Sequence, residues 1–365
     1  MSSVKSIMMI IGIAALTLQA TPPVNPQKAS AGDLTFSGQW FLAWQSCTEP
    51  DSTFNQFALK QGYVTFQKIF NSRFSARITQ DIAVDHEGDG MGNIEIRLKY
   101  GYLRYSFEKL LFLTRPFIEA GLVHRPWIDF EQKINRYRVQ GPMYLERRSL
   151  LRSADYGVTF SALIGDILVD DSRQFISPHY PGKFGSLAVG IYNGGGYDMI
   201  ENNNNKLIEG RLSLRPVPKR LPGFQCHYIG AYGKGNTTAA PDFSLNAFSL
   251  TIEQHNIVLV STLISGCGDA FGILVDNRGH SLEQNGYSQF FELRSGRMGA
   301  SLFGRYDRLR TYLSGNDRYC EIYIAGLACS LFEKARLVAD VEYQKEQETS
   351  TKHQRTFEIA IEFLY

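Results

Sequence analysis

Cations gather in one short stretch of the sequence, between His124 and Arg152. The six that could act together are Arg125, Lys133, Arg136, Arg138, Arg147 and Arg148. With Arg152 there are seven cations against Asp129, Glu131 and Glu146, and seven minus three leaves a net charge of +4. Fixed cations at a narrow passage favour anions, because low-dielectric walls focus the field. The alternative is a solvated outer loop whose charges bind lipid head groups or no partner.

Other chemistry has weak support in the residues. The acidic stretch from Asp85 to Gly90 partly matches a calcium loop, but its twelfth position is Ile96 instead of a bidentate Glu. The five cysteines show no CxxC or Cys/His spacing typical of zinc. The glycines at 194–196 are not followed by the Lys-Ser/Thr pair of a phosphate-binding loop. We therefore expect no metal and no cofactor.

Catalysis also lacks a signature. A lipase built on a membrane barrel would need a Ser, a His and an orienting polar residue together on the lipid side. His124 is in phase with Ile118, Ala120 and Leu122 and could face outward near a rim. No Ser has a matching signature, so we expect no enzyme. Two further classes stay open, a soluble β-protein that binds sugars or partners and a non-conducting adhesin or scaffold barrel.

The elements that position these residues show a period of two. On the last segment Phe357, Ile359 and Ile361 share one face, whereas Glu358 and Glu362 share the other. Over 93–102 the apolar residues Ile94, Ile96, Leu98, Tyr100 and Tyr102 alternate with Glu95, Arg97 and Lys99. Turning such cations toward a bilayer midplane would cost about 2 to 4 kcal/mol each. The charged face is therefore predicted to meet water inside a barrel.

The same reasoning predicts the lining of the lumen. Its charged residues are Arg97, Lys99, Arg211, Arg215, Arg305 and Asp307. Seven carboxylates on polar faces are expected there too, and they could cancel any anion preference: Glu95, Glu119, Glu209, Glu292, Asp340, Glu358 and Glu362.

Sixteen such segments are predicted along the chain, which makes the fold all-β, a transmembrane antiparallel up-and-down β-barrel. They are 34–45, 56–69, 74–84, 93–106, 114–124, 152–164, 185–193, 207–215, 223–234, 244–253, 256–266, 286–295, 297–308, 319–331, 335–345 and 353–365. An even count returns both termini to one side, as in bacterial barrels. Segments 244–253 and 256–266 alternate poorly, so fourteen or eighteen strands stay open. Connections alternate between short and long, except that 165–184 is long where a short turn is expected.

The first residues read as an export signal. Lys5 precedes an apolar run from Ile7 to Leu18, which is too short to cross a membrane as a helix. We predict a signal peptide over 1–31 and a single barrel domain over 32–365, with an inward-folding loop near 125–151. The net charge of +2 gives no general attraction to nucleic acid. The odd number of cysteines leaves a disulfide between Cys267 and Cys320 open.

Several stretches resemble a known family. Arg125-Pro126-Trp127 leads through Glu146-Arg147-Arg148 to Asp155-Tyr156-Gly157-Val158, and the chain also carries Gly304-Arg305-Tyr306-Asp307 and an aromatic last strand. With Val189 to Gly194, these motifs resemble the phosphate-selective porin O and P family of outer-membrane channels. They are short and degenerate, and span roughly residues 34–365. The resemblance implies a sixteen-stranded, trimeric porin, but this chain matches the family's cationic pore lining only in part.

Together these expectations describe a channel of the bacterial outer membrane, in contact with its lipid. Small hydrophilic or anionic solutes would diffuse through a water-filled lumen, because a barrel of sixteen strands leaves an aqueous interior. No nucleotide-binding or redox motif supplies energy for active transport.

Overall fold

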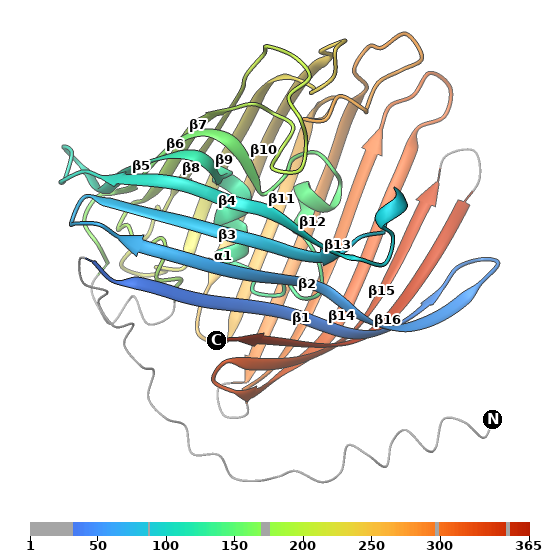
Figure 1. Cartoon of the computed structure of the whole chain (residues 1–365), viewed down its shortest axis with the longest axis horizontal. Coiled ribbons are helices and arrows are strands. Elements are labelled where there is room, and N and C mark those ends of the chain that lie inside the picture. Colours follow the sequence, from blue (N-terminus) through green and yellow to red (C-terminus); the bar gives the residue numbers. More distant parts are fainter. Residues whose placement is uncertain (1–31, 87, 169–175, 296–298, 348–350) are drawn as a thin grey trace. The chain divides into compact units, whose positions relative to one another are not determined.

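The computed structural model describes residues 32–365 apart from 87, 169–175, 296–298 and 348–350. The predicted signal peptide lies outside the described residues. Over the described part, sixteen antiparallel strands form a closed barrel (Figure 1). No helix among these residues is long and apolar enough to cross a membrane.

The strands follow one another around the barrel in sequence order. They are β1 (Leu34–Thr48), β2 (Thr53–Ile69), β3 (Phe74–Val84), β4 (Ile94–Ser106), β5 (Leu113–His124), β6 (Ala154–Ile164), β7 (Gly185–Tyr192), β8 (Leu207–Leu214), β9 (Phe224–Lys234), β10 (Asp242–Glu253), β11 (Ile257–Cys267), β12 (Glu283–Ser295), β13 (Ala300–Thr311), β14 (Arg318–Phe332), β15 (Ala335–Gln347) and β16 (Thr351–Leu364). The short helices are η1 (Gly88–Gly90), α1 (Pro126–Ile134) and α2 (Tyr144–Arg147).

Pairing of the first and last strands closes the barrel. Trp40 of β1 pairs with Phe363 of β16, and the register continues to Thr48 and Arg355. The sixteen strands confirm the predicted fold class and exclude fourteen or eighteen strands for the described chain. The start of β1 and the end of β16 lie at the same end of the barrel, here called the terminal end; the opposite one is the loop end.

The outer face is apolar and carries rows of aromatic rings. At the terminal end Phe36 packs on Phe66 and on Tyr365, with ring centroids 5.2 and 5.4 Å apart. Nearer the loop end a second row runs over four neighbouring strands, through Tyr287, Tyr306, Tyr323 and Tyr343. Such girdles are typical of barrels whose outer surface meets both lipid interfaces.

The predicted directions of three side chains are wrong, and they follow from two local backbone irregularities. In β4 the register with β3 shifts between Thr79 and Gln80, which leaves Lys99 as an extra residue. A bulge of this kind changes the phase of the strand, so Tyr100 and Tyr102 are buried inside the barrel instead of sharing the outer face of Ile96.

The second correction concerns His124 in β5. Gly121 adopts φ +128, where a Cβ atom would lie 2.3 Å from the carbonyl oxygen of Gly101. Only glycine accepts this close approach and conformation. Beyond it the alternation no longer holds, and the His124 ring stacks on Tyr100 at 4.0 Å inside the barrel.

The cysteines do not support the suggested disulfide. All five are free. Cys267 lies on β11 beside Ser244, whereas Cys320 on β14 contacts Arg148 and Glu346. The two sulfur atoms thus belong to different surroundings.

Candidate functional site

The segment from Arg125 to Arg152 begins with α1, which packs within the ring of strands (Figure 1). Pro126 stands at the first helical position, where its missing N–H has no cost. Trp127 and Phe130 are fully buried, and both contact the ring of His227 on β9. The amphipathic helix therefore covers one side of the barrel interior.

Arg125 anchors the start of this segment. Its guanidinium lies 2.8 Å from Asp155 of β6 and 2.5 Å from Glu209 of β8, and also over the ring of Tyr192. Arg125 has no exposed surface. The sequence placed this cation at a constriction, but in the structure its charge is neutralised within a buried network.

Three further arginines of the predicted set fasten the segment to strands on the other side. Arg136 pairs with Glu292 of β12 at 2.7 Å, and Arg147 pairs with Glu342 of β15 at 2.7 Å. Arg148 contacts the thiol of Cys320 on β14. These contacts come from strands around the ring, so the segment extends across the interior instead of projecting outward.

Lys133 and Arg138 differ from the other four because each lines a cavity and has no carboxylate within 3 Å. Lys133 has only a distant carboxylate, Asp129, at 3.9 Å. Arg138 lies 3.3 Å from the hydroxyl of Tyr63 and 3.8 Å from Glu146. Burial raises the pKa of the Asp129 carboxyl, but Lys133 and other partners lower it more strongly, so it stays below its usual range.

The predicted lumen residues face the interior, and most are covered by the segments that fill it. Arg211, Arg215 and Arg305 donate to backbone carbonyl oxygens of Pro126, Gly182 and Pro142. Asp307 accepts from Ser288 and Arg305. The three arginines hold interior segments in place instead of lining open water, and Asp307 holds Arg305.

Arg97 and Lys99, the other two, lie on β4 near the loop end. Arg97 is part-exposed and lies 3.6 Å from Glu95 and 4.0 Å from Asp81. Lys99 is buried, with its ammonium over the ring of Tyr197 at 4.6 Å.

The connection at 165–184, which sequence reasoning left without an account, reaches the same helix. The hydroxyl of Tyr180 donates to Asp129, and its ring packs on Phe130 at 4.7 Å. The backbone N–H of Ser177 donates to Glu253 of β10. This connection is therefore long because its described part packs beneath α1 from the terminal end.

Two adjoining cavities of about 260 and 310 Å³ remain between α1 and the wall of β1 to β7. Both are lined by Gln67, Arg77, His124, Asp129 and Lys133. Cationic side chains outnumber the carboxylates of Asp129 and Glu119 in their lining: Arg77, Lys99, Arg104, Arg125, Lys133 and Arg138.

Sequence reasoning missed Arg77, Arg104 and His124 as members of this lining. Arg77 carried a usable signal, because Arg77, Thr79 and Asp81 alternate with Ile78 in β3. Arg104 and His124 could not be assigned in this way, since the bulge in β4 and the conformation of Gly121 change the phase before them.

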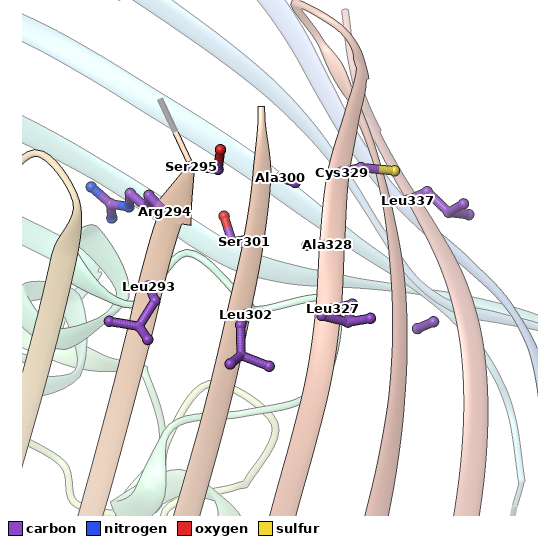
Figure 2. A pocket seen from close by; sticks show the side chains of 11 residues that line it. Leu293, Arg294, Ser295, Ala300, Ser301, Leu302, Leu327, Ala328, Cys329 and Leu337 are labelled. Atoms are coloured by element: carbon purple, nitrogen blue, oxygen red, sulfur yellow. The ribbon is translucent and has the colours of Figure 1, made fainter. Parts of the chain in front are cut away.

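A further hollow of about 580 Å³ lies on the outside, over β12 to β15 (Figure 2). Leu293, Leu302 and Leu327 line it in a row from neighbouring strands, with Cys329 and Leu337 beyond them. Its surface is nearly all apolar and belongs to the outer face. It therefore suits acyl chains and does not belong to a path for hydrophilic solutes.

Ser213 and His227 form a Ser–His pair inside the barrel, with the hydroxyl oxygen 2.7 Å from the ring nitrogen. Both residues are buried, and the second imidazole nitrogen of His227 lies 2.9 Å from Thr251 instead of a carboxylate. A substrate has no access to this hydroxyl. Among the described residues no group of three or more His, Cys, Asp or Glu side chains could hold a metal ion.

Comparison with known proteins gives structural likeness only. No family model and no curated protein matches the sequence. An anion-selective porin from Comamonas acidovorans superposes with a TM-score of 0.61 at 9% identity, over 92% of this chain and 100% of that one. OmpT, an outer-membrane protein of Vibrio cholerae in trimer form, gives a TM-score of 0.59 at 13% identity, over 92% of this chain and 100% of that one.

The outer-membrane channel DcaP of Acinetobacter baumannii gives a TM-score of 0.55 at 8% identity, over 92% of this chain and 98% of that one. The fold is that of outer-membrane porins. At these identities the likeness extends to the fold alone, and membership of the phosphate-selective family is not established by it.

Proposed function

We propose that this chain is a passive porin of the bacterial outer membrane, exported through its first residues and assembled as a homotrimer. Small hydrophilic solutes would diffuse between α1 and the inner wall of β1 to β7, with a weak preference for anions. The observation that carries the proposal is the pair of cavities in which cations outnumber carboxylates.

The anion preference is assigned to fewer residues than the sequence suggests. Arg125, Arg136 and Arg147 are neutralised by carboxylates within 3 Å. Lys133 and Arg138 line the cavities, where Arg77 adds a guanidinium whose hydrogen bond goes to the hydroxyl of Thr79. A charge that lines a narrow passage acts on passing ions at short range. The field of a charge farther away is screened within about 8 Å at physiological salt.

Planar-bilayer recording of the folded full chain tests the proposal. We expect stable conductance and, in a salt gradient, a reversal potential that favours anions. The double substitution of Arg77→Gln and Lys133→Gln should bring the anion-to-cation permeability ratio closer to one. Lys206→Gln, at an exposed loop position, is the matched control and should leave the ratio unchanged.

A non-conducting adhesin or scaffold barrel is the competing function, and the dense filling of the interior favours it. No conductance from pure, folded protein would support that function and contradict the porin. Cation preference in the unmodified protein would contradict the anion assignment alone.

A further inference from the structure

Among the described residues, Lys99 has a buried ammonium inside the barrel that makes no hydrogen bond. The ammonium of Lys99 lies 5.2 Å from the ring centroid of Tyr63 and 4.6 Å from that of Tyr197. The residue is 3% exposed, and its Nζ makes no hydrogen bond to any described residue. Cation–π contacts compensate only part of the cost of burying an ammonium. Lys99 lines the 310 Å³ cavity, so an acceptor there would complete its surroundings.

The other charges of this cavity also favour an anion. Arg77, Lys133 and Arg138 line it with Lys99, and Asp129 supplies the one carboxylate side chain of the lining. Glu146 lies behind it, 3.8 Å from Arg138 and accepting from Ser153. The side chains of these four cations and two carboxylates carry a net charge of +2.

Aromatic rings form much of the remaining wall. The rings of Tyr63 and Tyr100 line the cavity, and Leu364 adds an apolar contact. Tyr365 also borders it, but its ring packs on Phe36 at the outer face. One face of Tyr100 is stacked with His124 and the guanidinium of Arg77 lies 5.0 Å from its centroid. Ring faces carry partial negative charge and ring edges positive charge, so such walls accept an apolar ring more readily than a compact dianion.

The size of the cavity limits the ligand further. At about 310 Å³, it lies at the lower end of the range for small-molecule sites, about 300 to 1,000 Å³. A single ring with one charged substituent suits this volume together with the polar and aromatic lining.

We propose that the cavity beside Lys99 is a binding site for a small aromatic monocarboxylate, whose carboxylate contacts Lys99 and Arg138 while its ring packs between Tyr63 and Tyr100. The inference rests on the proposed porin function for the ligand's access. It goes beyond a general anion preference, because it selects one chemical class of solute.

Calorimetric titration of the folded full chain in detergent, with benzoate as the probe, tests the site. Acetate and inorganic phosphate supply charge without a ring, and benzamide supplies a ring without charge. We expect benzoate to bind more tightly than all three. Lys99→Gln should weaken benzoate binding about tenfold, as loss of one short-range charge contact predicts. Lys206→Gln should leave it unchanged.

Heat-modifiable gel mobility shows whether each variant is folded, and Arg77→Gln provides a second test if Lys99→Gln does not fold. Phosphate binding as tightly as benzoate would overturn the aromatic class in favour of an inorganic anion. Benzamide binding as tightly would overturn recognition of the carboxylate. Equal benzoate affinity in the folded Lys99→Gln and Arg77→Gln variants would overturn the location.

Bilayer recording separates this proposal from the porin function. Benzoate should reduce the chloride current of the unmodified channel with a half-blocking concentration near its dissociation constant. Chloride current without benzoate binding would overturn the site and leave the porin intact. Benzoate binding by a protein that carries no current would overturn the porin and support the site.

Discussion

At the scale of single residues, Arg125 and Lys133 show how similar charges take different roles within one helix and its start. Arg125 lies between Asp155 and Glu209 with no exposed surface. Lys133, on α1, lines both cavities. Removing one partner of a buried ion pair costs about 3 to 5 kcal/mol because a charge is left uncompensated. Arg125 is therefore a structural residue, whereas Lys133 borders the cavities without a close ion pair.

Glu131 on α1 gives a prediction about pH. Burial raises the pKa of its carboxyl to about 7, and Arg305 offsets only part of this effect. The folded pKa exceeds the unfolded value of 4.5, so protonation of this carboxyl stabilises the folded state. The stabilisation is complete below pH 4.5 and is lost as the pH rises through 7. The shift corresponds to at most about 3 kcal/mol.

We expect the urea midpoint for loss of heat-modifiable mobility to be lower at pH 8 than at pH 5, and Glu131→Gln to reduce this difference. Glu108→Gln is the control, since Glu108 is exposed in a hairpin. An unchanged pH difference in Glu131→Gln would show that Glu131 does not ionise within the folded state.

The sequence identified the six cations of the interior segment but could not assign their partners. Glu209, Glu292 and Glu342 come from strands 80 or more positions further along the chain. Their pairing depends on barrel closure and on the path of the segment, neither of which a local pattern contains. The division between neutralised cations and those that line the cavities therefore became visible only in three dimensions.

At the scale of elements, the strands were predictable because one face meets lipid and the other meets a polar interior. The predicted range 74–84 coincides with β3, and 335–345 differs from β15 only at its end. The sequence could not predict the phase beyond the bulge at Lys99 or beyond Gly121, because these irregularities insert or rotate one residue without changing composition.

The connection at 165–184 yields a prediction at this scale. The Tyr180 hydroxyl joins it to Asp129 on α1. Hydrogen bonds to charged groups contribute about 1.5 to 3 kcal/mol, so Tyr180→Phe should loosen the contact between these two interior elements. We expect larger current fluctuations in bilayer recordings and a lower urea midpoint.

Tyr228→Phe is the matched control, because its hydroxyl bonds to Tyr232 and Asn246 on the outer face. It should leave the current fluctuations unchanged. Equal fluctuations in Tyr180→Phe and the unmodified channel would mean that the connection does not restrain α1.

At the scale of the whole molecule, the interior combines strong local charge with weak net charge. Glu358 pairs with Lys60 at 2.6 Å, and Glu362 pairs with Arg336. Like the ion pairs of Arg125, Arg136 and Arg147, these pairs neutralise cationic side chains, which then attract solute anions less strongly. The carboxylates on the polar faces made this cancellation possible from the sequence, and it is the physical reason why the selectivity we propose is weak and set by few residues.

Closure by β16 is the feature on which the whole barrel depends. Ten residues of β1 pair with β16, and β15 pairs with its other edge. Deleting residues 351–365 would leave β1 and β15 with unpaired backbone N–H and C=O groups. Hydrocarbon offers these groups no hydrogen-bond partner, and each unpaired group costs several kcal/mol. We expect the truncated chain to lose heat-modifiable mobility and to become sensitive to protease in membranes. Deleting 314–316, in the loop between β13 and β14, removes no strand pairing and should preserve both properties. A truncated chain that still resists protease and conducts would show that β1 and β15 can close the barrel directly.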